Sequence, residues 1–86
     1  MKTILVLGAG TMGAGIAQTC AQSGYTVFLR DIKEEFVAKG IGIITGSLSR
    51  LVDKGKMEAA KKDEILGRIT GIVDMAEAKN ADFVIE

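Results

Sequence analysis

Three glycines near the N-terminus have a spacing that could bind a phosphorylated ligand. Gly8, Gly10 and Gly13 form the pattern GxGxxG. The first would let the chain turn sharply, the second would let the backbone approach a pyrophosphate, and the third would let a helix pack close to a sheet. Free N–H groups near Thr11 and Met12, at the positive end of a helix dipole, would stabilise the phosphate charge. Because the triplet alone is a weak signal, its sequence context must decide whether it binds a dinucleotide.

An acidic residue stands where a dinucleotide site needs one. Asp31 lies 18 residues after Gly13, at the end of the second predicted strand. Its carboxylate would accept hydrogen bonds from both ribose hydroxyls of an adenosine and would face a 2′-phosphate unfavourably, which favours NAD over NADP. Arg30 argues against this preference for NAD, because a guanidinium beside that position can pair with the 2′-phosphate of NADP. The alternative is a tight βα turn without a ligand, in which the acid caps the following helix.

The elements predicted around these residues form a βαβ unit. Residues 4–7 are continuously apolar, which is typical of a parallel strand covered on both faces. Apolar positions at helical spacing predict a helix over 11–23 that stops at Gly24, and residues 25–30 are rich in strand formers. The glycine triplet therefore joins a strand to a helix, and Asp31 closes the next strand, which is the dinucleotide-binding arrangement.

The rest of the sequence predicts a helical hairpin and two more strands. Helical spacing runs from residue 33 to about 54 and again from 57 to 66, with a turn between them. Strands are predicted over 68–73 and 82–86, separated by a helical turn over 74–79. We therefore predict an α/β fold of the Rossmann type, with a parallel sheet in the order 3-2-1-4 and a helical hairpin insertion.

The longer predicted helix contains three internal glycines, Gly40, Gly42 and Gly46. Each costs roughly 0.5–1 kcal/mol relative to alanine in a helix interior. We expect close packing against a neighbouring element to compensate for all three.

Composition narrows the classes of protein and of partner. The 86 residues are 48% apolar and 26% charged, which indicates one small domain or part of a larger one. Lysine plus arginine balance aspartate plus glutamate at 11 each, so no net charge favours nucleic acid or an anionic membrane. No apolar run is long enough for a signal peptide core or a membrane span. Histidine, the commonest general base, is absent.

Cys20 is the single cysteine, so no internal disulfide is possible, and neither CxxC nor a cysteine–histidine cluster predicts a metal site. A reducing, cytoplasmic location fits this pattern best. Cys20 falls on the expected inward face of the first helix, where we expect the thiol to act as a small apolar core residue.

Five stretches of the sequence carry a family resemblance. They are ILVLGAGTMGAGIAQ, RDIKEEFV, SLSRLVDKGKM, RITG and the final DFVIE. Over essentially all of residues 1–86 the chain resembles the N-terminal part of the 3-hydroxyacyl-CoA dehydrogenases, most closely the bacterial 3-hydroxybutyryl-CoA dehydrogenases. The resemblance implies NAD as cofactor, an acyl-CoA as substrate, and hydride transfer between 3-hydroxybutyryl-CoA and acetoacetyl-CoA.

The resemblance also implies that the catalytic residues lie elsewhere. In relatives, a catalytic histidine and glutamate lie on later segments, and a helical C-terminal domain forms the dimer. Residues 1–86 are then a partial NAD-binding Rossmann domain with no catalytic residue. We expect this chain alone to bind NAD or ADP without catalysing the reaction. The alternative is a non-catalytic, self-associating half-Rossmann module, because an apolar last strand could pair with a second copy.

A second set of residues, Ser47, Arg50 and Lys54, is implied by the family. In relatives, polar residues of the hairpin contact the 3′-phosphate-ADP portion of coenzyme A. Arg50 and Lys54 are four residues apart, so two cations could meet the same phosphate. The alternative is a solvated helix face that Asp53 and Glu58 partly neutralise.

Overall fold

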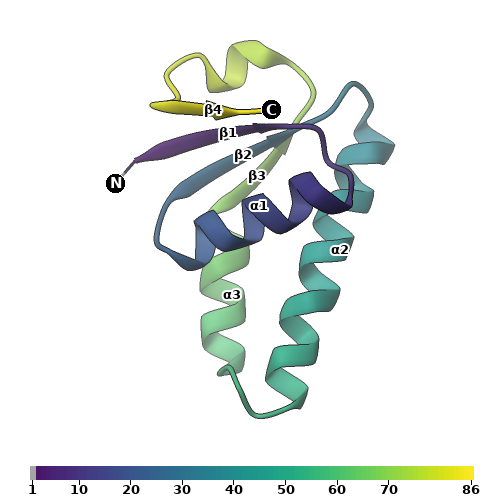
Figure 1. Cartoon of the computed structure of the whole chain (residues 1–86), viewed down its shortest axis with the longest axis vertical. Coiled ribbons are helices and arrows are strands. Elements are labelled where there is room, and N and C mark those ends of the chain that lie inside the picture. Colours follow the sequence, from purple (N-terminus) through teal and green to yellow (C-terminus); the bar gives the residue numbers. More distant parts are fainter. Residues whose placement is uncertain (1) are drawn as a thin grey trace.

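Four parallel strands form a sheet at the centre of the computed structural model, which describes residues 2–86 (Figure 1). Residue 1, the first residue of the predicted domain, lies outside the described residues. In chain order the elements are β1 (Thr3–Leu7), α1 (Thr11–Gln22), β2 (Thr26–Arg30), α2 (Glu34–Asp53), α3 (Ala59–Gly67), β3 (Ile69–Ile72), the 3₁₀ helix η1 (Met75–Ala78) and β4 (Phe83–Ile85).

The sheet has the order β3-β2-β1-β4, which confirms the predicted order. Leu5 in β1 pairs with Phe28 on one side and with Val84 on the other, and every pairing is parallel. Strand β1 lies between β2 and β4, and its residues Ile4, Leu5 and Val6 are all buried, as the continuous apolar run predicts. The strand order reverses between β1 and β4, and ligands of open parallel sheets bind at such reversals.

Helices α1, α2 and α3 cover one face of the sheet, whereas the short η1 lies on the other (Figure 1). The larger core lies between the sheet and helices α1, α2 and α3, where Leu29, Ile44, Leu48 and Ile65 are fully buried. A smaller cluster under η1 joins Leu5 and Ile72 of the sheet to Ala78. The three longer helices share one face because right-handed crossovers place the helices of the β1–β2 and β2–β3 connections on the same side of the sheet.

The prediction that the glycines of α2 pack closely against neighbours holds for only one of the three. A Cβ on Gly40 would lie 2.6 Å from the carbonyl oxygen of Ala9, so close packing is confirmed there. A Cβ on Gly42 would meet no atom within 4 Å, and one on Gly46 would meet only the Arg50 guanidinium at 3.9 Å. The expectation of close packing is therefore wrong for Gly42 and Gly46, and nothing in the structure explains those two glycines.

The first helix buries small side chains rather than its cysteine. Ala14, Ala17 and Ala21 are fully buried, and they let α1 approach the sheet closely. Cys20 packs against the same core, which confirms its predicted inward side, but it is only partly buried. Partial burial raises the pKa of its thiol, because removal from water disfavours the thiolate.

Helix and strand boundaries differ from the predictions by one or two residues. Helix α3 begins at Ala59 rather than 57, because the backbone turns at Gly55, whose φ is +72°, and is still extended at Glu58. Asp82 does not extend β4, but its N–H donates to the Thr3 carbonyl at 2.8 Å and its carboxylate accepts from the Thr3 N–H at 2.8 Å.

Within residues 2–86, no helix has the length and apolar character that crossing a membrane requires. The same residues contain no group of three cysteine, aspartate or glutamate side chains that could hold a metal ion.

Candidate functional site

The loop between β1 and α1 makes its turn at Gly8. This glycine has a φ of +99°, a left-handed conformation that other residues rarely adopt. Its N–H donates to the Arg30 carbonyl at 2.8 Å, which fixes the loop to the end of β2. The carboxyl ends of β1 and β2 and the start of α1 therefore meet at one edge of the sheet.

Gly13 and Gly10 serve the loop in different ways. A Cβ on Gly13 would lie 1.8 Å from the Gly8 carbonyl oxygen, so only glycine allows the start of α1 to lie against the loop. A Cβ on Gly10 would meet no atom within 4 Å. The space in front of Gly10 is open, and a ligand could approach its backbone closely.

The N-terminal end of α1 offers unsatisfied N–H groups to that space. The first turn of a helix has no intrahelical acceptors for its N–H groups, and the N-cap Gly10 has no side chain to supply one. No acidic residue lies in the first turn to neutralise the helix dipole. The exposed Thr11 and Met12 belong to this turn, and Met12 is 80% exposed, so it does not pack in the core. These features suit an anionic ligand such as a diphosphate.

The Asp31 carboxylate accepts two backbone hydrogen bonds, and one of them comes from the loop. Its Oδ2 accepts from the Ala9 N–H at 2.8 Å, and its Oδ1 accepts from the Ile32 N–H at 2.7 Å. The Ala9 hydrogen bond, and then that of Ile32, lowers the pKa of the Asp31 carboxyl, because both favour the charged form. Each carboxylate oxygen keeps a further lone pair, so the side chain can still accept from ribose hydroxyls.

These contacts bear on two alternatives that the sequence left open. Asp31 does not cap the following helix, because the N-cap of α2 is Lys33 and no side-chain hydrogen bond caps it. Arg30 uses its Nε to donate to the Val73 carbonyl at 2.9 Å, which ties the end of β2 to the residue after β3. This contact gives the guanidinium a structural role next to the site.

Two neighbouring pockets lie over the loop. A pocket of about 330 Å³ is lined by Val6, Leu7, Gly8, Gly10, Thr11, Met12, Gly13, Ile16 and Glu86. A second pocket, of about 220 Å³, is lined by Ala9, Gly10, Thr11, Asp31, Phe36, Lys39 and Ile43. The two share Gly10 and Thr11, so the structure brings together all six residues predicted to bind the cofactor.

Sequence reasoning missed the α2 side of the second pocket, which we call the Asp31 pocket. Phe36, Lys39 and Ile43 lie three and four residues apart, so they form one stripe on the helix. The signal that could have found them was Gly40, since a glycine at the point where α2 packs on the loop implies that its neighbours face the same site.

A larger pocket, of about 560 Å³, lies between α2 and the end of β3. Its lining includes the carboxylates of Glu34, Asp74 and Glu77 around apolar residues such as Val37 and Ile41. Three carboxylates oppose an anionic ligand, so size alone does not locate a dinucleotide site in this chain.

The residues implied to contact coenzyme A lie toward the far end of the hairpin from the glycine loop (Figure 1). Ser47 and Arg50 are in the second half of α2, but Lys54 follows its last residue as the C-cap, so it is not within the helix as the spacing suggested. No ion pair joins Arg50 or Lys54 to Asp53 or Glu58 in the described chain. Arg50 in the last turn also stabilises the negative end of the helix dipole.

Comparison with known proteins gives one consistent result. Residues 3–86 match the family described as 3-hydroxyacyl-CoA dehydrogenase, NAD binding domain. A probable 3-hydroxybutyryl-CoA dehydrogenase of Deinococcus radiodurans is 46% identical over 81 residues, which cover 94% of this chain and 29% of the relative. A protein of Bacillus subtilis with the same description is 38% identical over 86 residues, covering 100% of this chain and 30% of the relative.

A solved structure agrees with the sequence relatives. The crystal structure of (S)-3-hydroxybutyryl-CoA dehydrogenase from Ralstonia eutropha superposes with a TM-score of 0.93 at 42% identity, covering 98% of this chain and 30% of that one. The chain thus spans about three tenths of the length of these relatives.

Proposed function

The chain belongs to the NAD-binding domain family of the 3-hydroxyacyl-CoA dehydrogenases, and from this premise we propose that it binds the adenosine half of NAD for the oxidation of 3-hydroxybutyryl-CoA to acetoacetyl-CoA. The observation that carries the proposal is the Asp31 carboxylate, which two backbone N–H groups hold beside the open space at Gly10.

The start of α1 and the residue after β2 would bind different parts of the cofactor. The N–H groups at the start of α1 would hold the diphosphate, and Asp31 would hold the ribose hydroxyls. NAD, when bound, supplies the hydride acceptor for oxidation of a secondary alcohol. Asp31 is a poor candidate for a general base, because its hydrogen bonds lower its pKa and engage both of its oxygens.

Calorimetric titration with NAD and with NADP tests this function. We expect the wild type to bind NAD more tightly than NADP. Asp31→Ala should lower the affinity for NAD and reduce the difference between the two affinities. The lost charge-assisted hydrogen bonds correspond to about tenfold or more in affinity. Equal binding of NAD by the wild type and Asp31→Ala would rule out the ribose role.

For the hairpin, we propose that Ser47, Arg50 and Lys54 contact the 3′-phosphate-ADP portion of coenzyme A. Arg50 and Lys54 are both exposed and have no ion pair in the described chain, which supports the proposal. Arg50→Ala should lower the affinity for coenzyme A more than the affinity for 3′-dephospho-coenzyme A. Lys61→Ala, on α3, serves as the charge-matched control. A loss of the same size for both ligands would contradict a phosphate contact.

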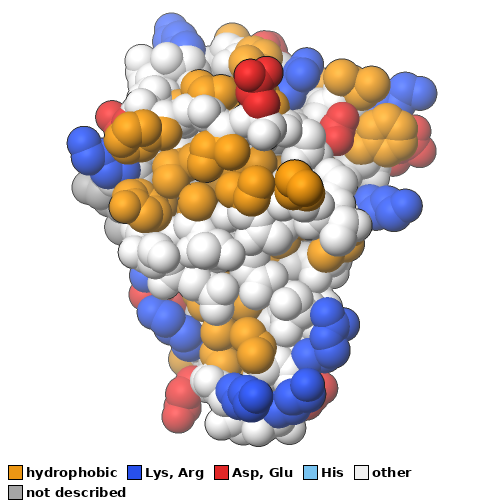
Figure 2. Space-filling view, viewed as in Figure 1, with side chains coloured by type: hydrophobic (Ala, Val, Ile, Leu, Met, Phe, Trp, Pro, Cys, Tyr) orange, Lys and Arg blue, Asp and Glu red, His pale blue; other side chains and the backbone are white. Residues whose placement is uncertain are grey.

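We also propose that the chain self-associates through β4, the edge strand beside β1. Phe83 and Val84 are 54% and 56% exposed, and Figure 2 shows apolar side chains gathered over the neighbouring surface. Such an edge can pair with a second copy. Light scattering should give a dimer mass that Val84→Lys lowers. A monomer mass with a melting temperature independent of concentration would refute self-association.

We propose a cytoplasmic location, on the ground that the lone Cys20 suits a reducing compartment. Fractionation of cells producing the tagged protein should recover it with the cytoplasm, and recovery from the cell envelope or the medium would contradict the assignment.

A further inference from the structure

The Asp31 pocket has two walls of different origin. One wall is the loop, with Ala9, Gly10 and Thr11, and the other is the stripe of Phe36, Lys39 and Ile43 on α2. Lys39 is the only cation among the lining residues of this pocket, which Thr11, the first residue of α1, also lines.

Helix packing holds Lys39 beside the loop. The neighbouring Gly40 lets α2 come so close that a Cβ there would lie 2.6 Å from the Ala9 carbonyl oxygen and 2.8 Å from the Ala9 side chain. Two fully or nearly buried residues, Ile44 and Val37, anchor the same part of α2 to the core. Lys39 therefore lines the pocket from a well-packed part of α2, and the place of its backbone does not depend on a loop.

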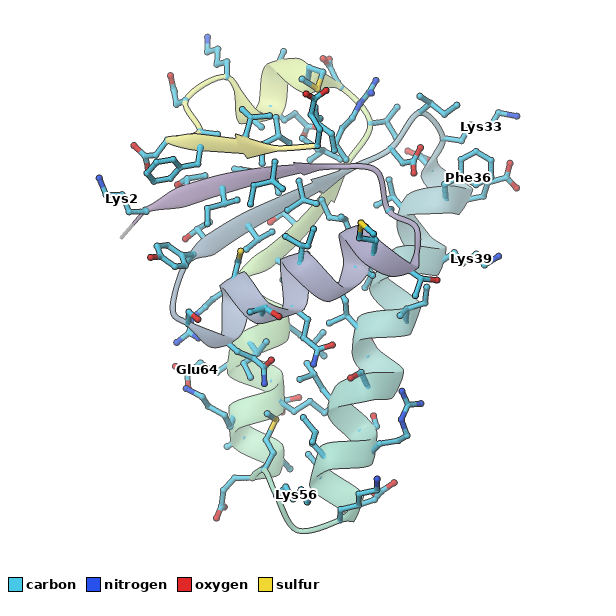
Figure 3. The ribbon with its side chains drawn as sticks, viewed as in Figure 1. Lys2, Lys33, Phe36, Lys39, Lys56 and Glu64 are labelled. Carbon is cyan, nitrogen blue, oxygen red and sulfur yellow. The ribbon has the colours of Figure 1, made fainter. Side chains whose placement is uncertain are left out.

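Among residues 2–86, no ion pair engages the ammonium of Lys39. No carboxylate lies within ion-pair distance of it in the part of the chain that the structure describes, where the ion pairs involve Glu64 with Lys61 and Arg68. Figure 3 shows the Lys39 side chain extended from α2 into solvent, beyond Phe36 along the helix. Lys33 is different, because its ammonium lies over the Phe36 ring at 5.9 Å. Lys39 can thus turn toward an anionic ligand without breaking an existing interaction.

We infer that Lys39 is a cofactor-binding residue, whose ammonium closes over the diphosphate of NAD from the side opposite the helix N-terminus. The inference rests on the proposed function, since it assigns one more contact to the same site. The diphosphate would then be held by backbone N–H groups of α1 on one side and by a flexible cation of α2 on the other. Because the ammonium is exposed, we expect a modest contribution that added salt weakens.

Titration of the 86-residue chain with NAD and with adenosine tests the inference. Lys39→Met keeps the aliphatic stem and removes the charge, and we expect it to weaken NAD by about fivefold at low salt. Adenosine has no phosphate, so its affinity should not change. Lys39→Arg should restore most of the NAD affinity. Lys56→Met is the charge-matched control, since Lys56 lies at the far end of the hairpin (Figure 3), and it should leave NAD affinity unchanged.

Three results would overturn the inference while leaving the proposed function in place. Equal losses for NAD and adenosine would show that Lys39 acts through its stem or through the shape of the pocket. Equal losses in Lys39→Met and Lys56→Met would show only a long-range effect of net charge. Unchanged NAD affinity in Lys39→Met, together with lost binding in Gly10→Val, would leave the loop as the binding site and exclude Lys39 from it. A wild type that binds no NAD would instead overturn the proposed function and the inference together.

Discussion

Substitutions at Gly13 and Gly10 should separate folding from cofactor binding within one loop. A Cβ on Gly13 would lie 1.8 Å from the carbonyl oxygen of Gly8 and 2.9 Å from its carbonyl carbon. Because non-bonded heavy atoms prefer separations of about 3.5 Å, the start of α1 would have to move from the loop by roughly 1.5 Å in Gly13→Ala. Overpacking costs about 1–3 kcal/mol, and we expect about 3 kcal/mol here, since the clash is with backbone.

That loss is large for a chain of this length. At about 0.05–0.15 kcal/mol per residue, 86 residues have a free energy of unfolding of about 4–13 kcal/mol. A change of 1 kcal/mol shifts the melting temperature of a domain of this size by about 4–8 °C, so Gly13→Ala should lower it by about 12–24 °C. Circular dichroism measures this shift directly.

Gly10→Val should have the opposite pattern. Gly10 has φ −71° and ψ −175°, an extended conformation that valine adopts readily, and its Cβ meets no atom within 4 Å. The weaker N-cap preference of valine costs about 1 kcal/mol. NAD binding should be lost, because the branched side chain fills the space in front of the loop. Calorimetry checks this, and an unchanged melting temperature for Gly13→Ala, or unchanged NAD affinity in folded Gly10→Val, would refute the reasoning.

Further predictions concern α2, pH and catalysis. Gly40→Ala should destabilise the fold by about 1–3 kcal/mol, because the added Cβ clashes with Ala9. Gly42→Ala should stabilise the fold by about 0.5–1 kcal/mol, because its Cβ meets open space and alanine is the better helix former. Equal unfolding midpoints of the two variants in urea would contradict this difference. Asp31 has a pKa below its ordinary value of 3.8, so its stabilising contribution is present above about pH 4 and is lost as the pH falls through the lower, folded-state pKa. The stability difference between the wild type and Asp31→Ala should therefore be constant from neutral pH down to about pH 5 and shrink only in stronger acid, and a loss near neutral pH would exclude this cause. The chain mixed with acetoacetyl-CoA and NADH should show no oxidation of NADH at 340 nm, and turnover belonging to the purified chain would show that it carries its own general base.

The sequence predicted most of the fold because the signals for it are local. The continuous apolar run of β1, the helical spacing after Gly13 and the position of Asp31 each depend on a few neighbouring residues. Right-handed crossovers then leave few arrangements for the strands, so the order of the sheet followed.

The rest of the site depends on contacts between distant parts of the chain. Asp31 receives an N–H from Ala9, and Gly40 packs on the same residue, but neither contact has a signature in the local pattern. For the same reason Lys39 could not be assigned to the cofactor pocket from spacing alone. The partly buried Cys20 shows another limit, since helical spacing gives the direction of a side chain but not the depth at which it is buried.

Titration of NAD into the isotope-labelled chain, followed by two-dimensional NMR, tests the central claim most directly. We expect the amide signals of residues 8–13 and 31–32 to shift together with one saturable affinity, and the signals of α3 to stay unchanged. NAD-dependent shifts confined to the carboxylate-lined pocket near β3, or to the hairpin, would contradict binding at the glycine loop, and so would the absence of any shift.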